Sequence, residues 1–164
     1  IMSTLNYIGI DEKSANKING QLNDLLANLQ VFYTNVRGFH WNIEGKMFFT
    51  LHAKFEELYD DLADKVDEVA ERILMLGGKP VNNFSEYLKV SEIKEISGVT
   101  CGKEAVQHIL NHFKTILVKE RQLLKSSDEA DDTATNDLMS DFIDGQEKLV
   151  WMYNALLTST CETK

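Results

Sequence analysis

The side chains best suited to chemistry in this sequence are metal ligands, and they gather between residues 40 and 71. His40 stands beside Trp41 where a long apolar-periodic segment ends, and His52 follows twelve residues later. Asp67 and Glu71 lie a further 15 and 19 residues along the chain. Imidazole and carboxylate together suit iron and related divalent metals. The types and spacing of these side chains therefore predict a metal site.

The same residues share one side of an expected helix. Residues four apart lie on one face, so His52 pairs with Glu56 and Asp67 pairs with Glu71. With 3.6 residues per turn, the acidic stripe comprises Glu56, Asp60, Asp67 and Glu71, with His52 at its edge. Carboxylates alone would more often form a solvated face. The histidine and the nearby tryptophan favour a binding site, because tryptophan is rarely left fully in water.

A metal centre inside one chain is not encoded. Bundles that hold two irons within one chain use Glu-x-x-His motifs on two of their helices. The residues three positions before the four histidines are Arg37, Phe49, Ala105 and Ile109. None of these is glutamate, so the ligands must be assembled in another way.

Helix geometry points to a site shared by two chains. At a rise of 1.5 Å per residue, His52 and Asp67 lie about 22 Å apart on one helix, too far to bind one metal. Two copies of this helix packed antiparallel, with a two-fold axis near Asp60, would bring His52 of one copy to Asp67 and Glu71 of the other. A two-fold interface is self-complementary, so it would make two such sites.

The other two histidines, His108 and His112, are four residues apart on a later helix. They lie roughly opposite its apolar residues, so we expect them to be exposed. Such a pair can contribute to a zinc site, but no third ligand is evident.

The elements that must position these residues are four long helices. Apolar residues recur at helical spacing over about 14–39, 47–76, 103–125 and 135–158. The sequence "GGKP", residues 77–80, ends the second helix. The connection over 77–100 is long for a bundle, and "FSEYLKV" within it predicts a short extra helix. We therefore expect an all-α fold, a single domain over 1–164 built as a ferritin-like four-helix bundle with one long crossover.

Composition narrows the function classes. The formal net charge is −9, from 26 acidic and 17 basic residues, which opposes nucleic-acid binding and favours cations. No run of about 18 apolar residues predicts a membrane span. The first residues show no basic region followed by an apolar stretch, so we expect a cytoplasmic protein. Cys101 and Cys161 are then expected to be free thiols, although a disulfide or a redox switch is the alternative.

The stretch "RGFHWNIEGKMFFTLHAKFEELYDDLADKVDEVAERILMLGGKP" resembles the Dps family, the ferritin-like DNA-binding proteins from starved cells. The resemblance extends over nearly the whole chain and includes "TNDLMSDFIDGQEKLVWMYNALL". It implies iron ligands at His40 and His52 of one subunit and at Asp67 and Glu71 of its partner, with Glu56 as a further candidate. It also implies a hollow shell of twelve subunits that oxidises Fe²⁺, preferentially with hydrogen peroxide rather than dioxygen, and stores a ferric mineral.

Further roles follow from the same resemblance. Asp132, Asp137 and Asp141 would line an acidic pore at a three-fold axis, the alternative being a solvated loop and helix start. Glu56, Glu57 and Asp60 would seed mineral. Trp41 would simply pack at the interface, or it would also donate an electron during peroxide chemistry. The chain has no Lys/Arg-rich extension of the kind through which some members bind DNA. The competing hypotheses are an architectural DNA-compacting protein and a helical oligomer that binds no metal.

Overall fold

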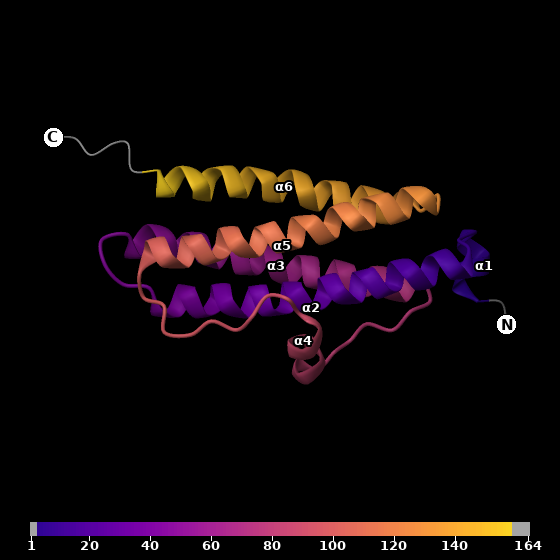
Figure 1. Cartoon of the computed structure of the whole chain (residues 1–164), viewed down its shortest axis with the longest axis horizontal. Coiled ribbons are helices and arrows are strands. Elements are labelled where there is room, and N and C mark those ends of the chain that lie inside the picture. The colour runs from indigo at the N-terminus through magenta and orange to yellow at the C-terminus, as the bar shows by residue number, and fades with distance from the viewer. Residues whose placement is uncertain (1–2, 159–164) are drawn as a thin grey trace.

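Four long helices run side by side through residues 3–158, the part of the chain that this computed structural model describes (Figure 1). The described elements are α1 (Thr4–Ile8), α2 (Glu12–Asn42), α3 (Phe48–Met75), α4 (Phe84–Val90), α5 (Gly102–Glu129) and α6 (Thr133–Leu157). The described residues contain no β-strand, only an isolated bridge between Glu44 and Cys101. The predicted all-α bundle with one long crossover is confirmed, as is the short helix at "FSEYLKV". The short helix α1 was not predicted.

Local chemistry explains where the helices begin and end. The Asp11 carboxylate accepts a hydrogen bond from the backbone N–H of Ser14 at 2.9 Å, which caps the start of α2. At the end of α3, Gly77 has a φ of +72°, a value that favours glycine. This turn lets Gly78 N–H donate to Ile73 O at 2.9 Å and Gly77 N–H donate to Leu74 O at 3.0 Å. These two bonds satisfy carbonyls that the end of a helix leaves free.

The core lies along the axis of the bundle, where the apolar faces of the long helices meet. Its largest buried side chains include four phenylalanines, at positions 32, 39, 55 and 113. The Phe32 and Phe113 rings meet edge to face, with centroids 5.0 Å apart, and join α2 to α5. Among the described residues, no helix is long and apolar enough to cross a membrane.

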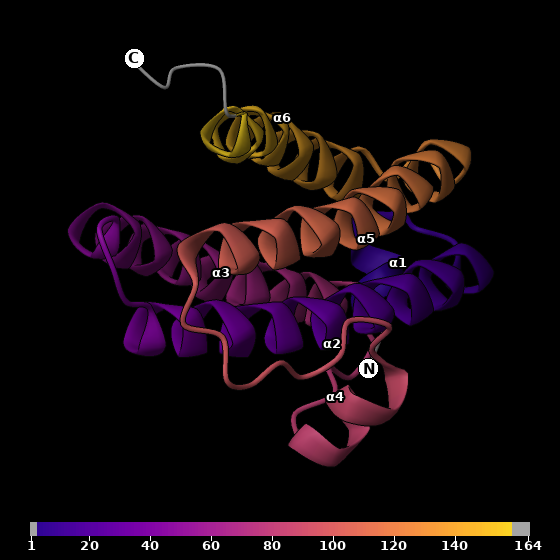
Figure 2. The ribbon, with the colours of Figure 1, turned by 60° about the vertical axis from the view of Figure 1, so that its left-hand side comes forward.

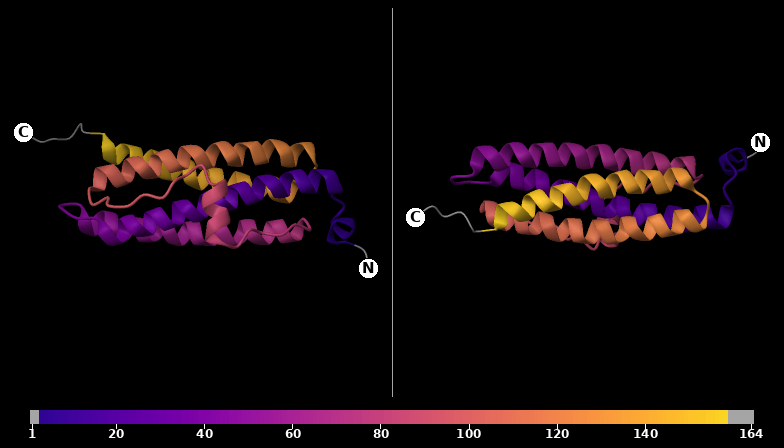
Figure 3. Two further views of the ribbon diagram at one scale, coloured as in Figure 1. Left: turned by 60° about the horizontal axis from the view of Figure 1, so that its bottom comes forward. Right: turned by 90° about the horizontal axis from the view of Figure 1, so that it is seen from above.

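The connection from α3 to α5 runs back along α2, as Figures 2 and 3 show from three directions. Asparagine side chains of α2 hold its backbone. Asn28 Oδ1 accepts hydrogen bonds from the N–H groups of Glu92 and Ile93. Asn35 donates to Lys94 O at 2.9 Å and accepts from Ile96 N–H at 3.0 Å. These contacts hold the connection on the outer side of α2. The connection therefore does not cover the face that α2 and α3 form together.

Candidate metal centre

His40 of α2 and His52 of α3 form a reciprocal pair. The Nδ1 of His40 lies 2.7 Å from His52 O, and the Nδ1 of His52 lies 2.8 Å from His40 O. The two rings stack with centroids 3.8 Å apart and planes inclined by 17°. His40 is buried and His52 is half-buried. The chain therefore brings the two predicted histidine ligands into direct contact.

The end of α2 explains why His40 O is available. This carbonyl belongs to the last turn of the helix, where intrahelical donors run out. The Glu44 N–H, which would have continued the helix, instead donates to Thr100 O at 2.9 Å. The His52 imidazole supplies the missing donor.

The hydrogen bonds also fix the protonation pattern of the pair. A carbonyl oxygen only accepts, so each Nδ1 must carry a hydrogen. In the neutral imidazoles, each Nε2 then keeps its lone pair, which is the form that binds a metal. The stack is enclosed by two further rings: Tyr59 meets His40 edge-on with centroids 5.3 Å apart, and Phe48 stacks on His52 at 4.9 Å. The geometry provides two oriented nitrogen ligands.

The carboxylates Asp67 and Glu71 lie elsewhere on the same chain. Both are exposed and stand on α3 one turn apart. Because α3 is one unbroken helix, the 15 residues between His52 and Asp67 correspond to about 22 Å. Among the described residues, no group of three or more His, Cys, Asp or Glu side chains converges closely enough to hold a metal ion. A single chain thus presents the two halves of the predicted ligand set separately.

The other acidic residues of the stripe are also on the surface. Glu56 and Asp60 are exposed on the same side of α3 as Asp67. Glu57 is exposed too, but its carboxylate accepts a hydrogen bond from Lys54 Nζ at 2.6 Å. Glu56 and Asp60 are therefore the better candidates for contact with free cations, because a neighbouring ammonium already offsets the charge of Glu57.

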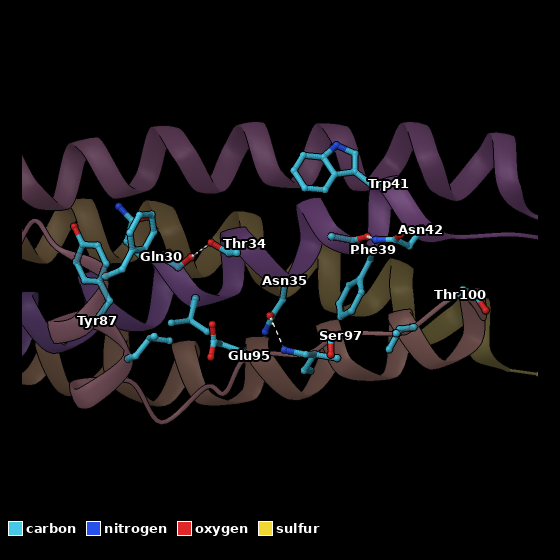
Figure 4. A pocket seen from close by; sticks show the side chains of 17 residues that line it. Gln30, Thr34, Asn35, Phe39, Trp41, Asn42, Tyr87, Glu95, Ser97 and Thr100 are labelled. Carbon is cyan, nitrogen blue, oxygen red and sulfur yellow. Dashed lines mark hydrogen bonds between the residues drawn. The ribbon is translucent and has the colours of Figure 1, made fainter.

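Trp41 points away from the histidine pair. Its side chain is 64% exposed, and the Arg37 guanidinium lies over its ring, 4.9 Å from the centroid. Trp41 and the exposed Phe84 help to line a groove of about 660 Å³ between α2, α4 and residues 95–100. Figure 4 shows the Trp41 ring along the upper edge of this groove, with Asn35 turned towards the connection. Trp41 is accessible, whereas the neighbouring His40 is not.

The three candidate pore residues divide into two kinds. Asp132 is buried: its carboxylate caps α6 by accepting from Thr135 N–H at 3.1 Å, and it pairs with Arg72 at 2.6 Å. In the single chain this carboxylate joins α3 to α6, and its place in a pore stays a prediction. Asp137 and Asp141 are exposed, one turn apart on α6. They stay candidates for a pore as well.

The expectation of exposed histidines on the third long helix is wrong for His112. His112 is buried against Phe32, with ring centroids 5.1 Å apart, and its Nε2 accepts a hydrogen bond from Asn35 Nδ2 at 3.1 Å. Burial, helped by His108, lowers its pKa to about 4. His108 is part-covered and stacks on Phe39 at 6.0 Å. The prediction from helical spacing failed because the connection from α3 to α5, which contains α4, covers a side of the bundle that would otherwise face water.

Sequence reasoning missed Tyr59 and Arg37. Tyr59 lies seven residues after His52, two turns along the same helix, and that spacing could have placed it near the histidines. It also contacts Tyr33 edge to face, with centroids 6.0 Å apart. Arg37 donates to the Tyr33 hydroxyl at 3.0 Å. No sequence signal distinguished Arg37 from an ordinary helix position.

Comparison with known proteins gives consistent matches. A family model for the ferritin-like domain matches residues 19–161. A DNA protection during starvation protein from Porphyromonas gingivalis is 51% identical over 154 residues, which covers 94% of this chain and 97% of that one. The crystal structure of a Dps protein from Vibrio cholerae superposes with a TM-score of 0.91 at 51% identity, covering 92% of this chain and 95% of that one. It is described as a member of a superfamily of ferritin-like diiron-carboxylate proteins. A Listeria innocua Dps variant with two histidines changed to glycine superposes at 0.82 with 29% identity, covering 85% of this chain and 93% of that one.

Proposed function

The chain belongs to the Dps family of ferritin-like proteins, and on this premise we propose that it oxidises Fe²⁺ between subunits and stores the product as a ferric mineral. The observation that carries this proposal is the reciprocal pair of His40 and His52, which leaves an Nε2 lone pair on each ring. His52 adjoins an exposed acidic stripe on its own helix, α3. The diiron-carboxylate description of the Vibrio cholerae relative supports iron as the metal.

The centre is proposed to form across a two-fold axis. An antiparallel partner α3 whose axis passes near Asp60 would bring Asp67 and Glu71 of the partner subunit to the histidine pair. The two altered histidines of the Listeria innocua variant are twelve residues apart, the same spacing as His40 and His52.

Each ligand would have a distinct role toward the iron substrate. The neutral imidazoles would capture Fe²⁺, and their bonds to backbone carbonyls would keep both rings in place while iron enters and leaves. The carboxylates of Asp67 and Glu71 would stabilise the higher charge of Fe³⁺. Two Fe²⁺ ions supply the two electrons that reduce one hydrogen peroxide molecule to water. Oxidation in this way would consume peroxide without releasing hydroxyl radicals, and dioxygen is the alternative oxidant.

Supply and storage would use the rest of the acidic surface. Asp137 and Asp141 would gather Fe²⁺ at a three-fold pore of a twelve-subunit shell in the cytoplasm, because a ring of carboxylates focuses the field on cations. Glu56 and Asp60 would receive Fe³⁺ where the mineral begins, with Glu56 also a candidate ligand. Trp41 would donate an electron when only one Fe²⁺ is available to a peroxide molecule. Its exposed ring and its neighbour Arg37 make it accessible for this role.

The second candidate function is the DNA protection named for several relatives. We propose that this chain does not bind DNA tightly, because its formal net charge is −9. A gel-shift assay across a salt series tests this. Retention of DNA at about 150 mM salt, where exposed charges are screened beyond about 8 Å, would favour the second function.

A mixed-subunit experiment tests the shared centre. One variant carries His52→Ala, and another carries Asp67→Ala with Glu71→Ala. Each homomeric shell has damage in every proposed centre. After dissociation and random reassembly, about half of the two-fold pairs are mixed, and each mixed pair contains one whole centre, so roughly a quarter of centres regain activity.

The control is each variant taken through the same dissociation and reassembly alone. Mass spectrometry must show that the subunits have exchanged. A centre within one chain would regain nothing, because neither variant carries the full ligand set. An initial oxidation rate for the mixture that stays at the average of the two parents, despite exchange, rules out the shared centre.

A further inference from the structure

A second polar pair lies inside the bundle, away from the candidate metal centre. Glu120 of α5 is fully buried, at 0% exposure, and Gln146 of α6 is 1% exposed. The Gln146 Nε2 donates a hydrogen bond to Glu120 Oε1 at 2.8 Å. Glu120 follows Ile116 by four residues and Phe113 by seven, so it lies on the apolar stripe of its own helix. A carboxyl group in this position needs an explanation.

The pair leaves two buried oxygens unpaired. Glu120 Oε2 and Gln146 Oε1 are both inaccessible, and neither has a hydrogen-bond partner among the described residues. Both are acceptors if the carboxyl is ionised, so two buried groups would then lack a donor, and one of them would carry charge. A single proton on Glu120 Oε2 supplies a donor that satisfies both oxygens.

The surrounding charges do not neutralise Glu120. Lys65 of α3 and Arg121 of α5 are the cations that act on it, and α6 offers the uncharged Gln146. Lys65 Nζ is held by Asp61 at 2.6 Å, and Arg121 forms an ion pair with Glu147 at the surface. Burial therefore outweighs both cations and raises the pKa of Glu120 to about 8.

We propose that Glu120 is protonated in the folded protein at neutral pH and donates its carboxyl O–H to Gln146 Oε1. With the observed bond from Gln146 Nε2, this closes a ring of two hydrogen bonds between α5 and α6. This ring holds α5 and α6 together only while Glu120 is protonated, and we refer to it as the proton-dependent lock. It is independent of iron, because it uses no residue of the proposed metal centre.

The sign of the pH dependence follows from the raised pKa. In the unfolded chain Glu120 has its ordinary pKa of 4.5, so between about 4.5 and 8 folding takes up one proton. The contribution of the lock is complete below 4.5 and declines as the pH rises towards 8. In that window, the folding equilibrium constant loses a factor of ten for each pH unit from this group. Alkaline conditions therefore weaken the packing of α6 on α5.

Glu120→Gln tests the lock, because two amides form the same ring without a proton. The matched control is Glu129→Gln, which removes one negative charge from an exposed position of the same helix. Urea unfolding is measured at about pH 6 and about pH 9, either side of the folded pKa. Glu120→Gln should lose less stability than the wild type over this range, and the control should follow the wild type. Equal losses in all three proteins overturn the proposal.

Infrared spectroscopy gives a second readout that does not depend on the variant folding. The wild-type protein at about pH 7 should show the C=O stretch of a protonated carboxylic acid, and raising the pH above about 8 should convert it to the carboxylate stretch. If Glu120→Gln folds, this band should be missing from its spectrum. A wild-type spectrum without an acid band at neutral pH shows that Glu120 is ionised and overturns the proposal.

Discussion

Two buried polar pairs bridge neighbouring helices in this bundle, and they use their hydrogen bonds in opposite ways. His40 and His52 join α2 to α3 by bonding to each other's backbone carbonyl, which leaves a ring nitrogen of each free. Glu120 and Gln146 join α5 to α6 by bonding side chain to side chain, with no atom left over once a proton is added. Side chains that bond to backbone carbonyls through one nitrogen keep the lone pair of the other nitrogen for a ligand. Side chains that use all their polar atoms on each other can only stabilise the fold.

The largest effect expected from this contrast is on iron oxidation. His52→Ala removes one proposed ligand nitrogen and the ring that stacks on His40, so we expect the peroxide-dependent oxidation rate to fall about 10- to 100-fold. The proposed shell should remain assembled, because the half-buried ring contributes little to the core. Initial rates and size-exclusion chromatography measure the two effects. His108→Ala, which removes a histidine outside the centre, should oxidise iron normally, and a wild-type rate for His52→Ala would remove it from the ligand set.

A large effect on stability is expected from His112, which belongs to neither pair. Its folded pKa of about 4 lies below the ordinary 6.5, so the unfolded chain binds a proton first as the pH falls. The contribution is complete above pH 6.5 and is lost towards pH 4, by roughly 3 kcal/mol from the two pKa values. Between pH 4.5 and 6.5 the contribution of Glu120 to the free energy of unfolding changes with pH in the opposite direction. The contributions of His112 and Glu120 should therefore cancel each other in the wild type over this range.

His112→Gln separates the two opposing groups. The amide can still accept from Asn35 but does not titrate, so this variant should gain stability relative to the wild type as the pH falls from 6.5 to 4.5. Urea unfolding at several pH values measures this difference. His108→Gln removes only the smaller contribution to the lowered pKa of His112, so its pH dependence should lie much closer to the wild type than that of His112→Gln. A constant difference between His112→Gln and the wild type across this range would show that His112 is not held neutral by burial.

The next effect sharpens the claim that the Glu120 pair is structural. Gln146→Met has a similar volume but offers no hydrogen bond, so both carboxyl oxygens of Glu120 lose their partner. We expect a loss of about 1–3 kcal/mol in the free energy of unfolding and no change in the iron oxidation rate. Gln122→Met, an exposed glutamine on α5, is the matched control and should change neither quantity. Slower iron oxidation by an intact Gln146→Met shell would contradict the separation of the two pairs.

The contrast between the pairs also shows what the sequence could predict. Apolar periodicity placed the four long helices because each buries one face, and "GGKP" marked a helix end that depends only on local turn chemistry. The twelve-residue spacing of His40 and His52 identified candidate ligands but not their contact. That contact depends on the turn over residues 43–47 and on Glu44 bonding to Thr100, a residue far along the chain. Such pairing across the fold leaves no periodic signal.

The polar residues in the core were the least predictable. Glu120 interrupts an apolar stripe, and the six asparagines in α2, three of them buried, are unusual because asparagine disfavours helix interiors. Both patterns were visible, but the partners were not: Gln146 is 26 residues away, and Asn35 bonds residues about 60 positions later. The pairing of Asp132 with Arg72 was hidden for the same reason, since an acidic loop residue gave no sign of this partner. Charge and spacing indicate polarity, whereas burial depends on which segment covers a residue.

The smallest effect concerns the support of the histidine pair by its neighbour Tyr59. The edge of the Tyr59 ring packs on His40, so Tyr59→Leu removes an aromatic contact while His40 and His52 keep their bonds to backbone carbonyls. The contact orients His40 without binding iron. We therefore expect the oxidation rate at saturating Fe²⁺ to fall only about two- to fivefold, with a weaker apparent affinity for Fe²⁺.

Tyr59→Phe is the matched control for this last prediction, because it keeps the ring and removes only the hydroxyl. If the ring positions His40, Tyr59→Phe should behave as the wild type and Tyr59→Leu should be impaired. If both variants are impaired equally, the hydroxyl matters, and Tyr59 then takes part in the redox chemistry instead of supporting the ligand. If neither is impaired, the two backbone carbonyls alone hold the pair, which would make the bonds between His40 and His52 sufficient for an oriented site.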